Sequence, residues 1–146
     1  MLMDSPHDRL ELDSQLTELI RLRSWIDLVT NHLDFAEEDR FAVQLCVEEA
    51  VANIILHGYR SEAGHPIIVR TCASAERTLT ITIDDQAPPF SPIEHHSHLP
   101  NDMKPLSLES ITPGGNGIRL LHGFSGSLSY ERLADGNRLI MAFPAP

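Results

Sequence analysis

Apolar residues recur at three- and four-residue spacing in two successive stretches near the N-terminus. In residues 15–33 this spacing predicts an amphipathic helix built on Leu16, Leu19, Ile20, Trp25, Ile26, Val29 and Leu33. The second stretch begins at Asp34, which has capping-box spacing to Glu37. It continues to about Leu56 and is expected to stop near Gly58, because glycine favours helix termination. The sequence therefore predicts two consecutive helices.

Other regions alternate polar and apolar residues or are rich in β-branched residues, and both patterns indicate strands. An Asp-Gly turn at residues 135–136 separates the last two of these regions and favours a hairpin. The predicted strands are a short one at 9–13, a hairpin of 67–72 with 78–83, and a second hairpin of 127–133 with 137–143.

Between the two hairpins lies a long irregular stretch, residues 86–113, which holds six of the ten prolines and three of the eight histidines. Loops of this length in a compact domain are usually functional lids or disordered segments. Four residues, 114–117, then form a glycine-rich turn before a short helical pattern at 118–124. The order of elements predicts one α+β domain over 1–146, a two-layer sandwich with helices on one face of a mostly antiparallel, mixed sheet.

Composition narrows the classes of partner. Apolar residues make up 42% of the chain and the formal net charge is −10, which is typical of a soluble globular domain and unlike a protein that binds nucleic acid or an anionic membrane. No signal peptide is expected, and no stretch is expected to be long enough to span a bilayer. Cys46 and Cys72 are interpreted as buried, reduced thiols, so a cytoplasmic location is expected.

The second helix carries two polar residues whose spacing is informative. Its apolar stripe is widened by residues such as Phe41 and Leu56, which predicts burial over most of the circumference. Glu49 and Asn53 are four residues apart and therefore share a face, whereas Glu48 diverges from Asn53 by about 140°. The pair can form a ligand-binding face, or Glu49 can simply bond Asn53 or lie on a solvated strip. The spacing alone does not decide between these.

Two further segments carry candidate chemistry. Asp85 ends a predicted strand, where its carboxylate can accept a hydrogen bond from an exocyclic amine such as that of adenine, or can simply begin a turn. Gly114, Gly115, Asn116 and Gly117 precede a helical pattern, and such a turn lets backbone N–H groups approach an anion. Each signal is weak by itself.

In this order, the three segments resemble the anti-sigma regulatory factor family. These serine/threonine-protein-kinase-like proteins belong to the GHKL superfamily, with gyrase, heat-shock chaperone ATPases, histidine kinases and mismatch-repair ATPases. The residues that carry the resemblance are EEAVANIILHGY at 48–59, DQAPPFSP at 85–92, GGNGIRLL at 114–121 and the final hairpin around 130–139. The resemblance implies a Bergerat-type ATP-binding fold that uses ATP and Mg²⁺.

The resemblance also implies roles for individual residues. Asn53 would coordinate Mg²⁺, Glu49 would be the general base, and Asp85 would accept the adenine amine. Ala87 would lie beneath the adenine, where the family commonly has glycine, and a lid would cover about 86–117. The turn expected to bring backbone N–H groups to the phosphates is formed by Gly114, Gly115, Asn116 and Gly117. In the last hairpin, Gly136-Asn137 replaces the Gly-Thr of many relatives.

The function implied is a kinase that phosphorylates a serine of a STAS-type anti-anti-sigma protein, and that sequesters a sigma factor when this antagonist is unavailable. Family members usually act as homodimers. A different class of function is also open: a non-catalytic, nucleotide-gated module that switches partners. A separated sensor-kinase domain is less consistent with the chain, since 146 residues leave no room for a phosphoacceptor and dimerisation segment.

Overall fold

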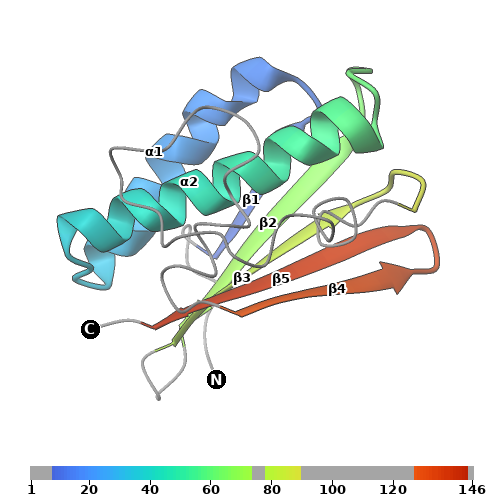
Figure 1. Cartoon of the computed structure of the whole chain (residues 1–146). Helices are drawn as coiled ribbons and strands as arrows, with labels where there is room; N and C mark the ends of the chain where they lie inside the picture. Colours follow the sequence, from blue (N-terminus) through green and yellow to red (C-terminus); the bar gives the residue numbers. More distant parts are fainter. Residues whose placement is uncertain (1–7, 74–77, 90–126, 145–146) are drawn as a thin grey trace, which may run out of the picture.

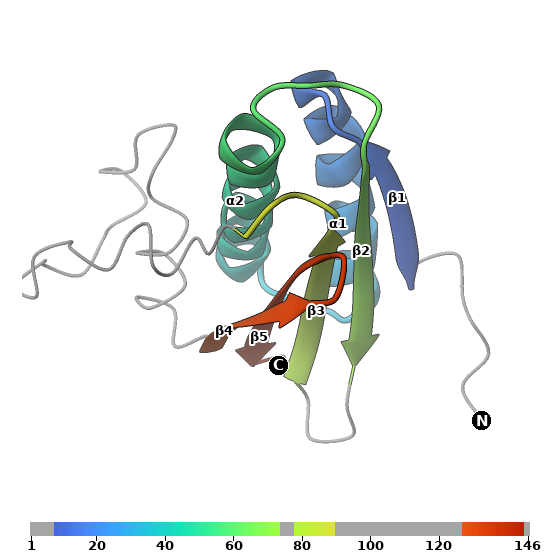
Figure 2. The same cartoon turned by 90° about the vertical axis from the view of Figure 1, so that its right-hand side faces the viewer.

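The protein folds into two layers, a pair of helices and a sheet. The computed structural model describes residues 8–73, 78–89 and 127–144. Helices α1 and α2 lie together across one face of a five-stranded sheet (Figure 1). The view turned by 90° shows the layers edge-on, with no other described element on the opposite face (Figure 2). The predicted α+β class and two-layer arrangement are confirmed.

The sheet follows the predicted strands closely. Its order is β1-β2-β3-β5-β4, and each neighbouring pair is antiparallel. The expectation of a mixed sheet is therefore wrong for the described strands. Both predicted hairpins are present. The bounds are β1 Arg9–Asp13, β2 Pro66–Ala73, β3 Thr78–Asp85, β4 Ser127–Leu133 and β5 Gly136–Pro144.

The helix-facing side of the sheet is defined by alternation along β3 and β5. Every second residue of β3 is buried, and the last member of this row is Asp85. Asn137 begins the equivalent row of β5 and lies directly opposite Asp85 in the strand register. Two polar residues thus continue a row of apolar pairs that form the core: Ile83 with Leu139, Ile81 with Met141 and Leu79 with Phe143.

The helical layer differs from the sequence prediction at one boundary. A 3₁₀ turn, Leu16–Glu18, leads into α1, Leu19–His32, and α2 spans Glu37–Asn53. The residue that caps α2 is Ala36, which makes no side-chain hydrogen bond, so the predicted Asp34 capping box is wrong. Asp34 instead adopts a left-handed conformation (φ 59°) and donates its backbone N–H to Asn31. It therefore closes α1 rather than opening α2.

Helix α2 is buried on one side only. Its stripe of Val43, Val47, Ala50 and Val51 packs in the core. Phe41 and Leu56, expected to widen this stripe, are 43% and 41% exposed. The prediction that these two residues widen the buried stripe is therefore wrong.

The same helix bears on the question of a membrane span. Together with the turn after α2, it forms a 22-residue segment, Glu37–Gly58, that is long and apolar enough to cross a bilayer. The expectation that no stretch reaches this length is therefore wrong. However, 56% of the 18-residue stretch that meets the hydropathy criterion is buried inside the protein. The core helix of a soluble domain has the same property, so length and hydropathy alone do not indicate a membrane span.

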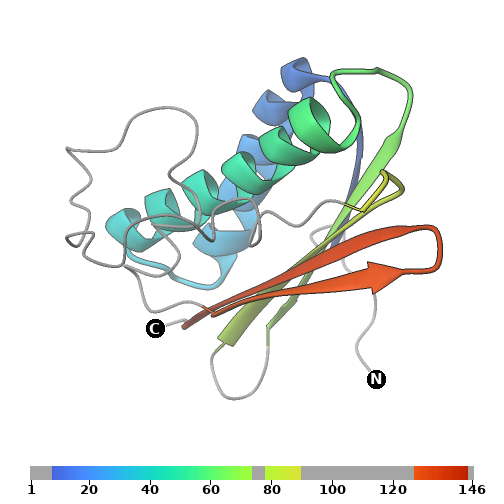
Figure 3. The ribbon, with the colours of Figure 1, turned by 45° about the vertical axis from the view of Figure 1, so that its right-hand side comes forward.

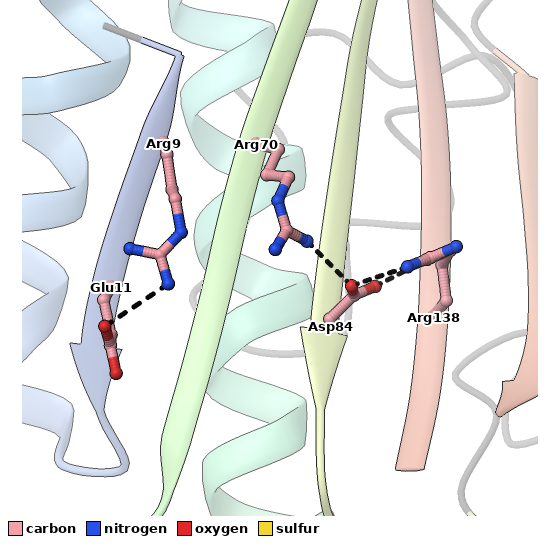
Figure 4. Close-up of polar contacts among 5 residues, drawn as sticks. All are labelled: Arg9, Glu11, Arg70, Asp84 and Arg138. Atoms are coloured by element: carbon pink, nitrogen blue, oxygen red, sulfur yellow. Dashed lines mark hydrogen bonds and ion pairs between the residues drawn. The ribbon is translucent and has the colours of Figure 1, made fainter. Parts of the chain in front are cut away.

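The outer face of the sheet is polar and carries an arginine-aspartate cluster (Figure 4). The Asp84 carboxylate accepts hydrogen bonds from Arg70 Nη1 at 2.9 Å and from Arg138 Nε at 2.8 Å. Burial acts to raise the pKa of Asp84, but the hydrogen bonds and charges of Arg138 and Arg70 outweigh it and lower the pKa. Asp84 is thus an ion-paired residue that joins β2, β3 and β5.

The cysteines occupy different environments. Cys46 is buried in α2, where burial raises the pKa of its thiol to about 12, whereas Cys72 is exposed on β2. Neither cysteine forms a disulfide, and the expectation that both are buried is wrong for Cys72.

Gly136 cannot carry a side chain where β5 begins. A Cβ placed there would lie 1.8 Å from the backbone oxygen of Asp85. We expect Gly136→Ala to lower the free energy of unfolding by about 3 kcal/mol, because the two strands must separate to admit the methyl group. Urea denaturation measures this value. Gly64→Ala is the control, since Gly64 has a positive φ of 95° but open space around it. Its cost should be about 1 kcal/mol, and equal losses in the two variants would contradict the steric explanation.

Candidate functional site

The C-terminal end of α2 carries a buried amide whose nitrogen has no partner within the described part of the chain. Asn53 is 6% exposed, and no described residue accepts a hydrogen bond from its buried Nδ2. Burying an unsatisfied amide donor costs about 1–3 kcal/mol, so such a group commonly serves a ligand. Glu49, one turn earlier on the same face, is half-buried. These two side chains therefore offer a carboxylate and an amide at one place on the helix.

The neighbouring acid, Glu48, has a structural partner. Arg23 of α1 donates from Nε to Glu48 Oε1 at 2.8 Å, and the Glu48 side chain is 12% exposed. This ion pair joins the two helices. The choice of Glu49 over Glu48 as the candidate base stays a prediction from their spacing to Asn53.

Helix α2 continues directly into a π-helical turn, Ile54–Gly58. The Tyr59 N–H donates to Ile54 at 2.8 Å and the Ser61 N–H donates to Ile55 at 2.7 Å. Single π turns of this kind are often found at functional sites. The turn lies between Asn53 and Tyr59 and ends the helix where the sequence predicted, near Gly58.

This turn packs against the residues that follow β3. A Cβ placed on Gly58 would be 3.1 Å from the Cβ of Ala87, which is closer than most real contacts of this kind. Figure 3 shows the end of β3 lying between the C-terminal end of α2 and the turn of the β4–β5 hairpin. Because Gly58 has no side chain, there is room beside it for the methyl group of Ala87. Ala87 is the residue that stands where the resemblance leads one to expect glycine.

Asp85 is a buried acid with one oxygen engaged. Its Oδ1 accepts the Ala87 N–H at 2.8 Å and an Asn137 Nδ2–H at 2.8 Å. Burial raises the pKa of Asp85, and the hydrogen bonds from Asn137 and Ala87 oppose that rise in part. All the hydrogen bonds given to this carboxylate by the described residues fall on Oδ1. Oδ2 is therefore available to accept a bond from a ligand.

Asn137 organises the segment after β3. Besides bonding Asp85, its Nδ2 lies 3.2 Å from the Ala87 carbonyl oxygen and 3.1 Å from that of Pro88. Its Oδ1 accepts from Arg132 Nη1 at 3.1 Å and from the Tyr130 hydroxyl. The sequence identified Asn137 only as a replacement for threonine. Its place on the buried side of β5 could have been found from the alternation along that strand.

The structure describes only part of the predicted site. Glu49, Asn53, Asp85 and Ala87 lie within the described residues. Gly114, Gly115, Asn116 and Gly117 lie outside them, as do residues 90–117 of the predicted lid and the helix expected at 118–124.

A hollow of about 700 Å³ lies near the other end of α2. It contains none of the predicted site residues. We therefore place the candidate site by side-chain chemistry rather than by this hollow, which is lined by Asp27, Glu37, Glu38, Arg40, Phe41 and Gln44.

A magnesium ion fits this site only if a bound ligand supplies most of its coordinating oxygens. Among the described residues, no group of three or more His, Cys, Asp or Glu side chains is placed to hold a metal. Mg²⁺ in nucleotide sites commonly takes one or two protein oxygens and completes its shell with phosphates and water. A buried amide such as that of Asn53 suits that limited role.

Comparison with known proteins agrees with the fold. The histidine kinase-like ATPase domain model matches residues 12–143. The serine/threonine-protein kinase BtrW of Bordetella bronchiseptica is 30% identical over 142 residues, covering 95% of this chain and 94% of that protein. The anti-sigma F factor of Clostridium acetobutylicum is 31% identical over 115 residues, covering 76% of this chain and 74% of that protein.

Solved structures show the same fold at low sequence identity. The RsbU and RsbW domains of Rv1364c from Mycobacterium tuberculosis match with a TM-score of 0.62 and 13% identity, over 94% of this chain and 32% of that one. The histidine kinase domain of the Erythrobacter litoralis EL346 blue-light activated histidine kinase matches with a TM-score of 0.54 and 19% identity. The match covers 89% of this chain and 60% of that one. The family match and the two relatives go further than fold: this chain belongs to the histidine kinase-like ATPase domains, in the family of anti-sigma regulatory factors and serine/threonine protein kinases.

Proposed function

We propose that residues 1–146 form one domain that binds ATP with Mg²⁺ and transfers the γ-phosphoryl group to a serine of a STAS-type anti-anti-sigma protein. The observation that carries the nucleotide assignment is the Asp85 carboxylate. One of its oxygens is held by Asn137 and the Ala87 N–H, and the other is left for a ligand. A buried acceptor held in this way suits the 6-amino group of adenine, which is a hydrogen-bond donor.

The remaining ligand contacts follow from the residues at the helix end and from the family. Asn53 would offer its side-chain oxygen to Mg²⁺, which neutralises phosphate charge when bound. Its Nδ2, which has no partner among the described residues, would donate to an acceptor of the ligand. Ala87 would lie against the base. The proposed phosphate-binding turn is Gly114, Gly115, Asn116 and Gly117, under a lid of about 86–117.

In the transfer step, Glu49 acts as general base. Its carboxylate takes the proton from the partner serine hydroxyl as the serine oxygen bonds to the γ-phosphorus. The bond from that phosphorus to the bridging oxygen breaks, and ADP leaves with the electron pair. Phosphoryl transfer depends mainly on positioning and charge stabilisation, so a single well-placed base meets the protein's share of proton chemistry.

Partners and location are proposed from the family. BtrW is named as a serine/threonine-protein kinase and the clostridial relative as an anti-sigma F factor. We propose that this chain likewise acts in the cytoplasm as a homodimer, binding an anti-anti-sigma protein and, in its absence, a sigma factor. The net charge of −10 is consistent with a protein partner rather than nucleic acid.

The test is phosphotransfer from γ-labelled ATP to a cognate STAS-type protein. We expect label on a serine of the partner with the unaltered protein and none with Asn53→Ala, which should lose nucleotide affinity. ATP binding without transfer would overturn the kinase proposal in favour of a non-catalytic, nucleotide-gated module. Failure to bind ATP at all would overturn the nucleotide assignment itself.

A further inference from the structure

Tyr59 links the end of α2 to the segment that bears Asp85. Its hydroxyl donates to the Pro66 carbonyl oxygen at 2.8 Å and accepts the Gln86 N–H at 2.6 Å. Tyr59 is 6% exposed, and its ring stacks on that of His65 with 4.7 Å between the two ring centroids. Burial raises the pKa of this phenol, so it remains a neutral hydroxyl at ordinary pH and keeps both bonds.

Gln86 lies between Asp85 and Ala87, the two residues proposed to contact the adenine ring. The Ala87 N–H bonds the Asp85 carboxylate. On the opposite side the same segment is held by Asn137, through the carbonyl oxygens of Ala87 and Pro88. Arg132 Nη1 also donates to the Ala87 carbonyl oxygen, at 3.1 Å. The segment is therefore held from the helix side by the Tyr59 phenol and from the hairpin side by the Asn137 amide and the Arg132 guanidinium.

The position of Tyr59 is set by the π turn. The Tyr59 N–H donates to the carbonyl oxygen of Ile54, five residues earlier. This π-helical bond ties Tyr59 to the end of the helix that carries Asn53. The phenol thus connects the end of the helix proposed to serve magnesium and phosphate with the segment proposed to bind the base. A rigid connection of this kind lowers the cost of ordering the site when a ligand binds.

We propose that Tyr59 is a positioning residue for purine recognition: without touching the nucleotide, its hydroxyl fixes the Gln86 backbone so that Asp85 Oδ2 meets the 6-amino group. This inference rests on the proposed nucleotide function. It assigns to Tyr59 a role in selecting adenine and not merely in holding the fold.

The test is Tyr59→Phe, which keeps the ring and its stacking on His65 and removes only the hydroxyl. Affinities for ATP and for inosine triphosphate, which has an oxygen in place of the 6-amino group, are measured by calorimetry. We expect ATP affinity to fall about tenfold, which corresponds to loss of one buried hydrogen bond. Affinity for inosine triphosphate should change little, so the ratio between the two nucleotides falls.

Ser14→Ala is a matched control. The Ser14 hydroxyl is buried and, like that of Tyr59, bonds two backbone groups, donating to Glu62 at 2.6 Å and accepting from His65 at 3.0 Å. Neither of these two bonds involves the segment after β3. Any general effect of losing a buried hydroxyl should therefore appear in Ser14→Ala as an equal loss for both nucleotides, with the ratio preserved.

The outcomes separate the two proposals. If the unaltered protein prefers ATP and Tyr59→Phe keeps the same ratio, Tyr59 has only a structural role and this inference is wrong. If the unaltered protein binds neither nucleotide, the proposed function itself is wrong. A lowered ratio in Tyr59→Phe, with the ratio of Ser14→Ala unchanged, supports the positioning role.

Discussion

Asp85→Asn is expected to reverse the nucleotide preference of the protein from ATP to inosine triphosphate. The asparagine oxygen can take over the two bonds that Asp85 Oδ1 now accepts from Ala87 and Asn137. Its NH₂ group must then occupy the place of Oδ2. A donor at that position opposes the 6-amino group of adenine and favours the 6-oxygen of hypoxanthine. Sites built around one hydrogen bond reject the mismatched ligand by about a hundredfold or more.

The same variant should differ little in stability from the unaltered protein at neutral pH, because two effects oppose each other. Burial raises the pKa of Asp85 in the folded state, so the ionised carboxylate costs folding free energy above that pKa, and the cost disappears as the pH falls through it. Replacing the acid with a neutral amide removes this cost, but without a ligand its buried NH₂ group has no acceptor, which costs about 1–3 kcal/mol. Calorimetric titration with both nucleotides, together with thermal unfolding at pH 7, measures the two effects. Equal loss of both affinities, or a large fall in unfolding temperature, would show that Asp85 is a structural residue.

Local patterns predicted most of the fold. The hairpins formed by β2 with β3 and by β4 with β5 were predicted because alternation and turn residues lie close together in the sequence. Both helices were predicted from their apolar spacing. The errors occurred where local signals compete: Asp34 has the spacing of a cap but is used in the left-handed turn that ends α1.

Other features depend on contacts between distant residues. From its sequence context, Gly136 looks like a turn glycine. Among the described glycines, however, only Gly64 has a positive φ. Glycine is required at position 136 because the Asp85 backbone approaches it from another strand. Asn137 meets Asp85 across 52 positions of sequence. The bond from Gln86 to Tyr59 spans 27 positions and follows a π turn that has no clear sequence signature. None of these could be derived from neighbouring residues alone.

For the site, the sequence identified residue types and the structure places four of them. Asn53 and Asp85 are both buried polar residues with unused bonding capacity in the described part of the chain, which suits the roles that the resemblance implies. Those roles remain predictions. The glycine-rich turn at 114–117 lies outside the described residues, so its approach to the phosphates also stays a prediction.

Glu49→Gln is expected to lower the rate of phosphoryl transfer to the partner serine by about a hundredfold to ten-thousandfold, the usual contribution of a general base. Glutamine keeps the size of the side chain but cannot accept the serine proton. ATP affinity should stay close to that of the unaltered protein, because the proposed base contacts the partner hydroxyl and not the purine. Single-turnover transfer from ATP, with nucleotide binding measured in parallel, separates the two quantities.

The adjacent acid provides a control on the same helix. Glu48→Gln also removes one negative charge, but from a carboxylate paired with Arg23 between α1 and α2. It should lower stability slightly and leave the transfer rate within a few-fold of the original. If instead Glu48→Gln abolished transfer and Glu49→Gln did not, the base would be on the other face of α2, and the partner serine would have to approach from the side of α1. If neither substitution slowed transfer, the reaction would proceed without a carboxylate base from this helix. In that case α2 would contribute to the reaction mainly by positioning the nucleotide.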